Sequence, residues 1–330
     1  MTNLFRTFLL ALLPIAGFAA APCVTSTVDC TEWVALGRGR SLVYRNLSLT
    51  TPNPAIKRAL IVIHGAGRNA DHYFQTAVAS AFLAGGLNDT LVISPRFASN
   101  DGSCRDKLDT EEVSWSCNGD SWRSGGKSVS HPALTSYDFA DELLKAVAKK
   151  SLFPNLKSIV VTGHSAGGQF VTRYQMANKV HDTLGVPVTY VVSNPSSYAY
   201  LDATRPNGET FRNFSDARNC TTFDNWPYGL QNRSGYVAAV ADDVLKTQLA
   251  ARPLVYLLGE IDILPLGGFD GSCPAMAQGP TRLARGQNFA KYAAEKFGAK
   301  HPVTVVHLCG HNDRCMFTSE EALPILFPKF

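Results

Sequence analysis

The chain has 330 residues, of which 45% are apolar and 18% are charged, and its net charge is +4. This composition is that of a globular protein, and α/β folds of this length often form one domain. No run of like charge occurs along the chain, so we expect neither the concentrated basic surface that binds nucleic acid nor a nucleic-acid partner.

Residues 1–21 have the pattern of a secretory signal peptide. An arginine is followed by an apolar run over residues 7–18 and then by small residues, with cleavage expected near Ala19 to Ala21. The apolar run is too short to span a bilayer comfortably, although an uncleaved anchor is the alternative. We therefore expect a secreted protein, extracellular or periplasmic, with residues 22–330 as one folded domain that has no membrane partner.

Export to an oxidising compartment would let the eight cysteines form disulfides. Eight cysteines allow many pairings, and four pairs are close or plausible along the chain: Cys23–Cys30, Cys104–Cys117, Cys220–Cys273 and Cys309–Cys315. A zinc site is the rival interpretation, but no C-x-x-C pair occurs, so we expect no metal. Five N-x-S/T sequons would carry glycans only in a host that glycosylates secreted proteins: Asn46, Asn88, Asn213, Asn219 and Asn232.

Apolar, β-branched segments alternate with amphipathic segments along the chain. In the first half of the chain, the pattern predicts a strand or hairpin over 40–50, a strand over 58–67, a helix over 71–86, a strand over 89–97, a helix over 137–150, a strand over 156–164 and a helix over 166–180. In the second half, it predicts a strand over 187–195, a helix over 236–250, a strand over 252–260, a helix over 283–298, a strand over 301–311 and a short final helix that starts near Ser319.

This alternation predicts an α/β fold with a mostly parallel central sheet and helices on both faces. Near-continuous apolar segments such as LVYLL, residues 254–258, fit strands that are buried on both faces. Two long loop insertions interrupt the alternation, over residues 98–133 and 199–235. Because long loops inside a compact domain are usually functional, we expect these insertions to shape a site.

Residues 163–167, Gly-His-Ser-Ala-Gly, match the pattern G-x-S-x-G between a predicted strand and a predicted helix. In such a nucleophile elbow, a strained turn pushes the serine hydroxyl out over the carboxyl ends of the strands. The glycines are needed because the turn leaves no room for side chains beside the serine. A glycine-rich turn without chemistry is the alternative, but the flanking strand and helix are the context that a nucleophile requires. We therefore predict that Ser165 is a nucleophile.

A serine hydroxyl needs a base, and the base needs a carboxylate that orients it. His311 follows the last predicted strand, at the correct end of the sheet. His301 precedes that strand, and His307 lies inside it, where we expect a packed residue. We therefore predict His311 as the base.

The orienting acid should follow the strand before that of the base, because the chain order in this kind of site is serine, acid, histidine. Asp262 lies slightly beyond the end of that strand and is the predicted acid. Glu260 is an alternative that could serve as a cap or a supporting residue, and Asp270 is a more distant one.

An oxyanion hole needs two N–H donors that point at the developing negative charge. One should come from Ala166, the residue after the nucleophile, and the other from the loop HGAGRN, residues 64–69. In that loop we predict Ala66 as the donor, with Gly65 as the second choice. His64 is expected to brace the loop rather than to act in catalysis.

Together, the segments HGAGRN, GHSAGG, LLGEID and CGHND resemble the α/β-hydrolase family, over most of the chain. The resemblance implies that fold, a reaction without metal or organic cofactor, and the roles given above: Ser165 as nucleophile, Asp262 as acid, His311 as base, and Ala166 and Ala66 as oxyanion donors. The GHSAGG elbow in a secreted chain is similar to that of extracellular carboxylesterases of the polyhydroxybutyrate depolymerase and feruloyl or acetylxylan esterase type. One departure is the acid loop, because residues 263–273 are long and glycine-rich.

The expected reaction is hydrolysis of a small-molecule or polymeric carboxylic ester through an acyl-enzyme. Aromatic residues of the insertions could line the substrate pocket, although loop packing around the disulfides is the alternative: Trp115, Trp122, Tyr198 and Trp226, with Tyr200 and Tyr228. No long apolar lid of the lipase kind is evident, which argues weakly against fats, so polymer, aryl and plant-wall esters stay open.

The rival functions are a serine peptidase of the same fold, an acyltransferase, and a catalytically silent hydrolase fold used for binding. No propeller or other added domain that could gate peptides is evident in the sequence. A silent protein predicts a damaged triad, whereas all three positions are filled here. The sequence therefore favours the esterase.

Overall fold

The computed structural model describes residues 21–118 and 121–330. The predicted signal peptide, residues 1–21, lies outside the described residues except for Ala21. In the part of the chain that is described, no helix is both long enough and apolar enough to cross a membrane.

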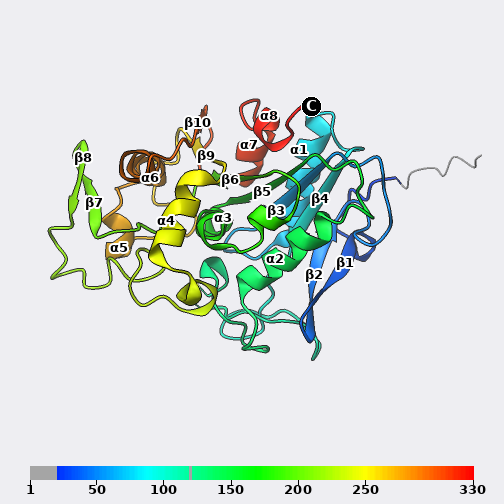
Figure 1. Cartoon of the computed structure of the whole chain (residues 1–330), viewed down its shortest axis with the longest axis horizontal. Coiled ribbons are helices and arrows are strands. Elements are labelled where there is room, and N and C mark those ends of the chain that lie inside the picture. The colour runs from blue at the N-terminus through cyan, green and yellow to red at the C-terminus, as the bar shows by residue number, and fades with distance from the viewer. Residues whose placement is uncertain (1–20, 119–120) are drawn as a thin grey trace, which may run out of the picture.

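The centre of the fold is an eight-stranded sheet (Figure 1). Its strands, in their order across the sheet, are β1 (Thr31–Leu36), β2 (Gly39–Arg45), β4 (Thr90–Pro95), β3 (Arg58–Ile63), β5 (Ser158–His164), β6 (Val188–Ser193), β9 (Leu254–Gly259) and β10 (Val303–Val306). β2 is antiparallel to both of its neighbours, and every other neighbouring pair is parallel. The prediction of a mostly parallel sheet is confirmed. A separate hairpin, β7 (Thr204–Asn207) and β8 (Thr210–Asn213), lies in the second insertion and projects at the left of Figure 1.

Helices cover both faces of the sheet, as predicted. They are α1 (Ala70–Leu83), α2 (Ser136–Val147), α3 (Ala166–Ala177), α4 (Asp242–Ala251), α5 (Cys273–Met276), α6 (Arg282–Phe297), α7 (Asp313–Thr318) and α8 (Leu323–Leu326). Short 3-10 turns add η1 (Val28–Cys30), η2 (Trp122–Ser124), η3 (His181–Thr183) and η4 (Gly235–Ala239). In Figure 1, α7 and α8 lie beside α1, whereas α2, α3 and α4 lie on the side of the sheet that faces the viewer.

The two faces have separate apolar cores, because successive residues of a strand point to opposite faces. Leu60 and Val62 of β3 share one core with Phe74 of α1 and Phe317 of α7. Ile61 shares the other core with the apolar side chains of α2, α3, α4 and α6. The sheet is thus buried on both sides, which explains its near-continuous apolar strands.

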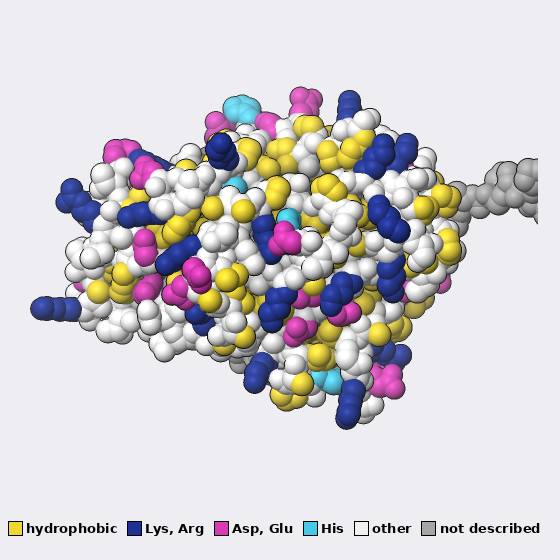
Figure 2. Space-filling model, in the orientation of Figure 1, with side chains coloured by type: hydrophobic (Ala, Val, Ile, Leu, Met, Phe, Trp, Pro, Cys, Tyr) yellow, Lys and Arg dark blue, Asp and Glu magenta, His cyan; other side chains and the backbone are white. Residues whose placement is uncertain are grey.

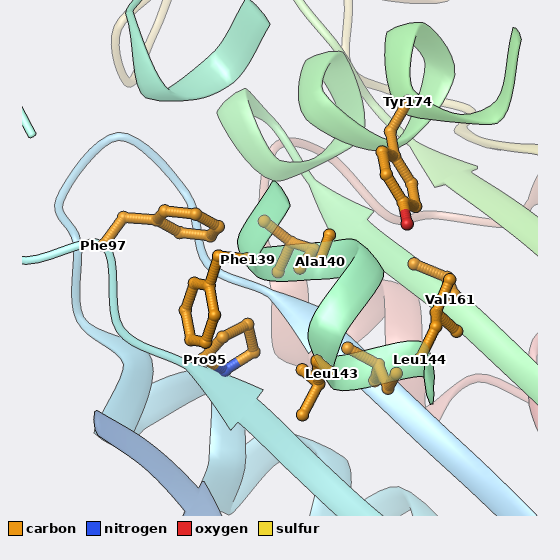
Figure 3. Close-up of a pocket in the computed structure, with 10 residues that line it drawn as sticks. Pro95, Phe97, Phe139, Ala140, Leu143, Leu144, Val161 and Tyr174 are labelled. Atoms are coloured by element: carbon orange, nitrogen blue, oxygen red, sulfur yellow. The ribbon is translucent and has the colours of Figure 1, made fainter. Parts of the chain in front are cut away.

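The contact between α2 and the sheet is apolar and tightly filled. Figure 3 shows Phe139 and Leu143 of α2 next to Pro95, and Leu144 next to Val161. The space enclosed among these side chains is about 10 Å³, close to the volume that one water needs. This space is therefore part of the core and has no room for an organic ligand.

The predicted helix over residues 236–250 begins only at Asp242. Tyr236 lies in the preceding turn η4, where its side chain is buried and its hydroxyl donates to the Asp141 carboxylate (2.6 Å). That contact holds the segment in a separate turn. α4 then starts with two acidic residues, Asp242 and Asp243, which favour a helix N-terminus.

The last predicted strand and helix also differ from the structure. β10 ends at Val306, well before residue 311, and the chain turns at Leu308 with a left-handed φ of 54°. The final short helix predicted near Ser319 corresponds to α8, which begins at Leu323. α7 was not predicted. It begins at Asp313, where the Asn312 side chain accepts from the Cys315 N–H (2.9 Å) and caps the helix.

The eight cysteines are joined in the four predicted pairs. One sequon is not available in the folded chain, because the Asn46 side chain is buried, donates to the Thr90 carbonyl (2.9 Å) and accepts from the Val92 N–H (2.8 Å). The asparagines of the other sequons are exposed: Asn88, Asn213, Asn219 and Asn232.

Charged side chains of both signs are interspersed on the face drawn in Figure 2, with apolar side chains between them. Within the described chain, some charged side chains form pairs, such as Arg233 with Asp242 (2.6 Å) and Lys145 with Glu142 (2.8 Å). This distribution is typical of a solvated surface.

Candidate active site

Ser165 lies on a sharp turn between β5 and α3. Its φ of 59° and ψ of −117° place it in a conformation that residues with side chains rarely adopt. The Ser165 N–H donates to the Ser193 carbonyl of β6 (2.9 Å), which fixes the turn against the neighbouring strand. This geometry is the strained strand-turn-helix that residues 163–167 predict.

The glycines around Ser165 are required by close backbone contacts. A side chain at Gly163 would collide with the backbone of Gly167, and one at Gly167 would collide with the carbonyl oxygen of Ile63. A β-carbon at Gly168 would lie 2.6 Å from the carbonyl oxygen of Ser193. The elbow can therefore approach β3 and β6 this closely only because these positions lack side chains.

Ser165, His311 and Asp262 form one hydrogen-bonded chain. His311 Nε2 lies 2.9 Å from Ser165 Oγ, and His311 Nδ1 lies 2.8 Å from Asp262 Oδ2. With its proton on Nδ1, the imidazole donates to Asp262 and accepts from the Ser165 hydroxyl. Asp262 is 2% exposed and Ser165 is 8% exposed, so the chain of groups is largely shielded from bulk water.

The three groups meet because parallel strands end at the same edge of the sheet. Ser165 follows β5, Asp262 follows β9, and His311 follows β10. The disulfide between Cys309 and Cys315 closes the loop that carries His311.

The alternative acids face other partners. Glu260 Oε2 lies 2.7 Å from Nδ1 of His307, and Asp270 accepts from the Tyr228 hydroxyl (2.8 Å). The prediction that His307 is packed inside a strand is wrong, because β10 ends at Val306 and the His307 side chain is 70% exposed.

Two backbone N–H groups next to Ser165 are free to donate. Ala166 is the first residue of α3, so its N–H has no partner within the helix. Ala66 lines the same pocket as Ser165, and its N–H donates no hydrogen bond within residues 21–118 and 121–330. Gly65 also lines the pocket, so both candidates in this loop lie beside Ser165.

His64 braces the loop that carries Ala66. Its Nδ1 lies 2.9 Å from the Gly65 carbonyl, and its Nε2 accepts from the Phe97 N–H (3.2 Å). These partners require a neutral imidazole with its proton on Nδ1. Burial accordingly lowers the pKa of His64 to about 4.

His164, inside the G-x-S-x-G pattern, is a neighbour of the site that the sequence analysis did not identify. Its ring packs against that of His311, and its Nδ1 lies 3.2 Å from the Tyr73 hydroxyl. The side chain is 3% exposed, and burial lowers its pKa well below the ordinary value, with the nearby His311 and Arg282 charges acting in the same direction. His164 is therefore neutral when the site works near neutral pH.

An open pocket of about 380 Å³ lies over Ser165. Its walls are formed by Gly65, Ala66, Gly67, Asn69, Tyr73, His164, Ser165, Gly267, Gly268, His311 and Asp313. Backbone and small polar groups predominate, and Asp313, the one carboxylate among them, is held by His72 (3.0 Å) and Thr76 (3.0 Å) of α1.

The aromatic residues predicted to bind substrate do not line this pocket. Trp115, Trp122 and Tyr198 are buried in the core, at 0%, 2% and 0% exposure. Trp122, for example, stacks on Phe97 with ring centroids 5.2 Å apart. The prediction for the three buried rings is wrong, because apolar packing takes them out of reach of a ligand.

The other aromatic residues of the insertions lie outside this pocket too. Trp226 is half-buried, lines a separate surface hollow, and donates to the Ser124 carbonyl (2.9 Å). Tyr200 is fully buried as well, and Tyr228 is half-buried against Asp270.

Arg282 is a second neighbour that sequence reasoning missed. It is fully buried at the start of α6, and its Nη1 lies 3.4 Å from Asp262 Oδ1. Burial lowers the pKa of Arg282, and the Asp262 carboxylate partly offsets that effect. A cation at a helix N-terminus is unfavourable because it opposes the helix dipole. The position of Arg282 in the first turn of a predicted helix is therefore a sequence signal by which it could have been found.

The sequence pattern of the alpha/beta hydrolase family matches residues 60–323 of this chain. No curated protein sequence matches it significantly. Poly(aspartic acid) hydrolase-1 from Sphingomonas sp. KT-1 has a similar structure, with a TM-score of 0.61 and 22% identity over 87% of this chain and 94% of that chain. LpqC, a poly(3-hydroxybutyrate) depolymerase from Bordetella parapertussis, gives a TM-score of 0.60 and 20% identity over 88% of this chain and 85% of that chain. The family match and the sheet topology together show that this chain belongs to the alpha/beta hydrolase family.

Proposed function

We propose that this chain is a secreted serine esterase that hydrolyses carboxylic esters through an acyl-enzyme. The observation that carries the proposal is the hydrogen-bonded chain from Ser165 through His311 to the buried Asp262. In such an arrangement, a base oriented by a carboxylate makes a weakly acidic hydroxyl reactive at neutral pH.

In the proposed mechanism, the Ser165 hydroxyl attacks the ester carbonyl carbon while His311 Nε2 takes its proton. Asp262 stabilises the imidazolium, and the N–H groups of Ala166 and Ala66 stabilise the oxyanion. The imidazolium then returns the proton to the leaving alcohol, which leaves an acyl-enzyme on Ser165. Water repeats the attack with His311 as base and releases the acid.

The pocket favours an uncharged ester. One structural neighbour is named for poly(aspartic acid) and the other for poly(3-hydroxybutyrate), and at this identity the likeness supports the fold alone. The pocket lining described above includes the Asp313 carboxylate and no lysine or arginine. A polyanion would be repelled there, whereas a neutral ester, small or polymeric, would not.

The four disulfides support the proposed secretion, because such bonds form and persist in oxidising compartments. Expression with residues 1–21 in a secreting host would test it. We expect the protein in the periplasm or medium with Ala20 or Pro22 as its first residue, and intact precursor in the membrane fraction would contradict the proposal.

Covalent labelling with a fluorophosphonate tests the proposed nucleophile, and turnover of p-nitrophenyl acetate tests the proposed reaction. We expect both in the native protein and neither in Ser165→Ala. A native protein that is neither labelled nor active would remove the enzyme and favour the silent binding protein. Labelling with cleavage of peptides but not of esters would favour the peptidase.

A further inference from the structure

The Arg282 side chain binds several parts of the candidate site at once. Its Nε donates to Ser196 Oγ (2.7 Å), in the loop that follows β6. Its Nη2 donates to the carbonyls of Leu266 (2.7 Å) and Gly267 (2.9 Å), in the loop that carries the acid. Its Nη1 faces Asp262 Oδ1 (3.4 Å), the carboxylate oxygen that His311 does not use.

The first two residues of the acid loop are held by the backbone, because the Ile261 N–H donates to the Cys309 carbonyl (3.1 Å) and the Asp262 carbonyl accepts from the Leu283 N–H (3.3 Å). Among the described residues, only Arg282 forms hydrogen bonds from another segment to residues 263–268. Ile261, Ile263, Leu264 and Leu266 each have roughly half of their surface or more exposed, so apolar packing contributes little. Gly267 and Gly268 are in left-handed conformations, and because glycine has many accessible conformations, the backbone alone does not fix the loop. Yet the position of the loop matters for the base, because a β-carbon on Gly267 would lie 3.2 Å from His311 Cδ2.

The electrostatic role follows from burial. Asp262 and Arg282 have side chains that are 1% and 0% exposed. A buried carboxylate without a counter-charge becomes neutral or moves toward water, and a neutral acid would no longer stabilise the imidazolium of His311. Arg282 supplies that counter-charge from the side opposite to the imidazole.

We propose that Arg282 is the positioning residue of this site: it supplies the counter-charge of Asp262, orients that carboxylate toward His311, and fixes the loop of residues 261–268 beside the base. The proposal rests on the proposed esterase function. Arg282 does not touch the substrate, and it acts through Asp262. Lysine could replace the charge but not the planar fork, which reaches acceptors in three directions.

Arg285, one helical turn further along α6, provides a matched control. It is equally buried, and both guanidinium groups lie over the Phe269 ring, that of Arg282 at 5.2 Å and that of Arg285 at 4.4 Å. It donates to the carbonyls of Ser196 (2.5 Å) and Asp270 (2.9 Å) but makes no contact with Asp262. Its loss would remove comparable structural support without removing the counter-charge of the acid.

The experiment is a double-mutant cycle with two signals. Arg282→Gln and Asp262→Asn are made singly and together, and Arg285→Gln is made in both backgrounds. The first signal is kcat and KM for p-nitrophenyl acetate. The second is the far-downfield proton NMR resonance of the His311 Nδ1–H, which needs no substrate and so reports on the Asp262 contact even if esters are not turned over.

We expect Arg282→Gln to lower kcat about 100-fold, with KM changed less than about 3-fold, because a buried charge has lost its partner. In the Asp262→Asn background the same change should cost less than about 3-fold. The downfield resonance should disappear or shift in Arg282→Gln and persist in Arg285→Gln. The Arg285→Gln control should cost the same factor in both backgrounds.

Equal losses from Arg282→Gln in the two backgrounds, or an unchanged downfield resonance, would overturn the proposal. If near-UV circular dichroism shows that Arg282→Gln does not fold, Arg282→Lys takes its place in the cycle, with an expected loss of about 10-fold that again vanishes beside Asp262→Asn. A native protein that neither turns over the ester nor reacts with the fluorophosphonate would remove the esterase function, and the NMR signal alone would then decide the role of Arg282.

Discussion

The imidazole rings of His164 and His311 lie against each other with their centroids 4.5 Å apart. A charge on the first ring would oppose the proton that the second must accept from the nucleophile. Burial lowers the pKa of His164 well below its ordinary value, so this ring stays uncharged. Of the two adjacent imidazoles, only that of His311 is then available to accept the proton.

Because His164 stays neutral, we expect only one group to titrate on the acid side of the kcat/KM profile. The logarithm of kcat/KM for a neutral ester should fall with a slope of one as the pH decreases below the midpoint. His164→Gln should keep that slope, because it removes a ring that does not titrate in this range. A slope of two in the native protein would mean that both imidazoles gain protons.

The close backbone contacts of the elbow predict that Gly167→Ala is strongly destabilising. The new methyl group would meet the carbonyl oxygens of Ile63 and His64, and the required shift of backbone should cost about 2 kcal/mol or more. Gly271→Ala is the control, because its methyl group would enter open space. In thermal unfolding followed by circular dichroism, the midpoint of Gly167→Ala should lie several degrees below that of Gly271→Ala. Similar midpoints would refute the close backbone contact at Gly167.

The lowered pKa of His64 predicts that the folded protein loses stability in mild acid. Its pKa is about 4 in the folded chain and about 6.5 when unfolded. Between these values the unfolded chain binds a proton that the folded chain does not, so the free energy of unfolding falls as the pH decreases, by up to about 3 kcal/mol from this group. Urea unfolding at pH 7.5 and pH 4.5 should show a smaller difference in His64→Asn, which keeps a donor for the Gly65 carbonyl. If the free energy of unfolding changes equally between the two pH values in the native protein and in His64→Asn, the acid sensitivity comes from groups other than His64.

The disulfide that closes the loop around His311 predicts a selective loss of activity. In Cys309→Ser/Cys315→Ser the loop should sample more conformations, and kcat should fall about 10-fold, since small displacements of a catalytic group are costly. Cys23→Ser/Cys30→Ser is the control, because that bond lies at the start of the described chain. A fall in activity that only accompanies a matching loss of near-UV circular dichroism would show that the bond has a structural role alone.

The carboxylate in the pocket wall predicts a preference among substrates. p-Nitrophenyl butyrate should have a higher kcat/KM than the anionic mono-p-nitrophenyl succinate, and Asp313→Asn should reduce the ratio about 3- to 10-fold. Asp71→Asn removes an exposed carboxylate that does not line the pocket and should leave the ratio unchanged. Equal ratios in the native protein and in Asp313→Asn would exclude an electrostatic role for this wall.

The elbow could be predicted from the sequence because its requirements are local. Gly163 and Gly167 must be small for contacts within and next to one turn, and the flanking strand and helix have clear periodicity. The positions of Asp262 and His311 followed from chain order and from where strands end. Four cysteine pairs could be predicted because most are close in sequence.

The features that could not be predicted from the sequence depend on contacts between segments that are far apart in the chain. The pattern of a loop tryptophan such as Trp115 does not distinguish a pocket wall from a core, because both bury aromatic surface. The contacts of Arg282 with Ser196 and of Tyr73 with His164 join residues 86 and 91 positions apart. β1 was not predicted, because a short strand with an exposed Trp33 at the sheet edge has little apolar alternation.

The base follows β10, which has only four residues and one neighbour, β9, at the margin of the sheet. Short strands at the edge of a sheet unfold locally before the central strands do. The half-life of catalysis on heating would then be governed by fraying of this strand rather than by cooperative melting of the whole domain, and inactivation should be recoverable on cooling while the remaining strands keep their pairing.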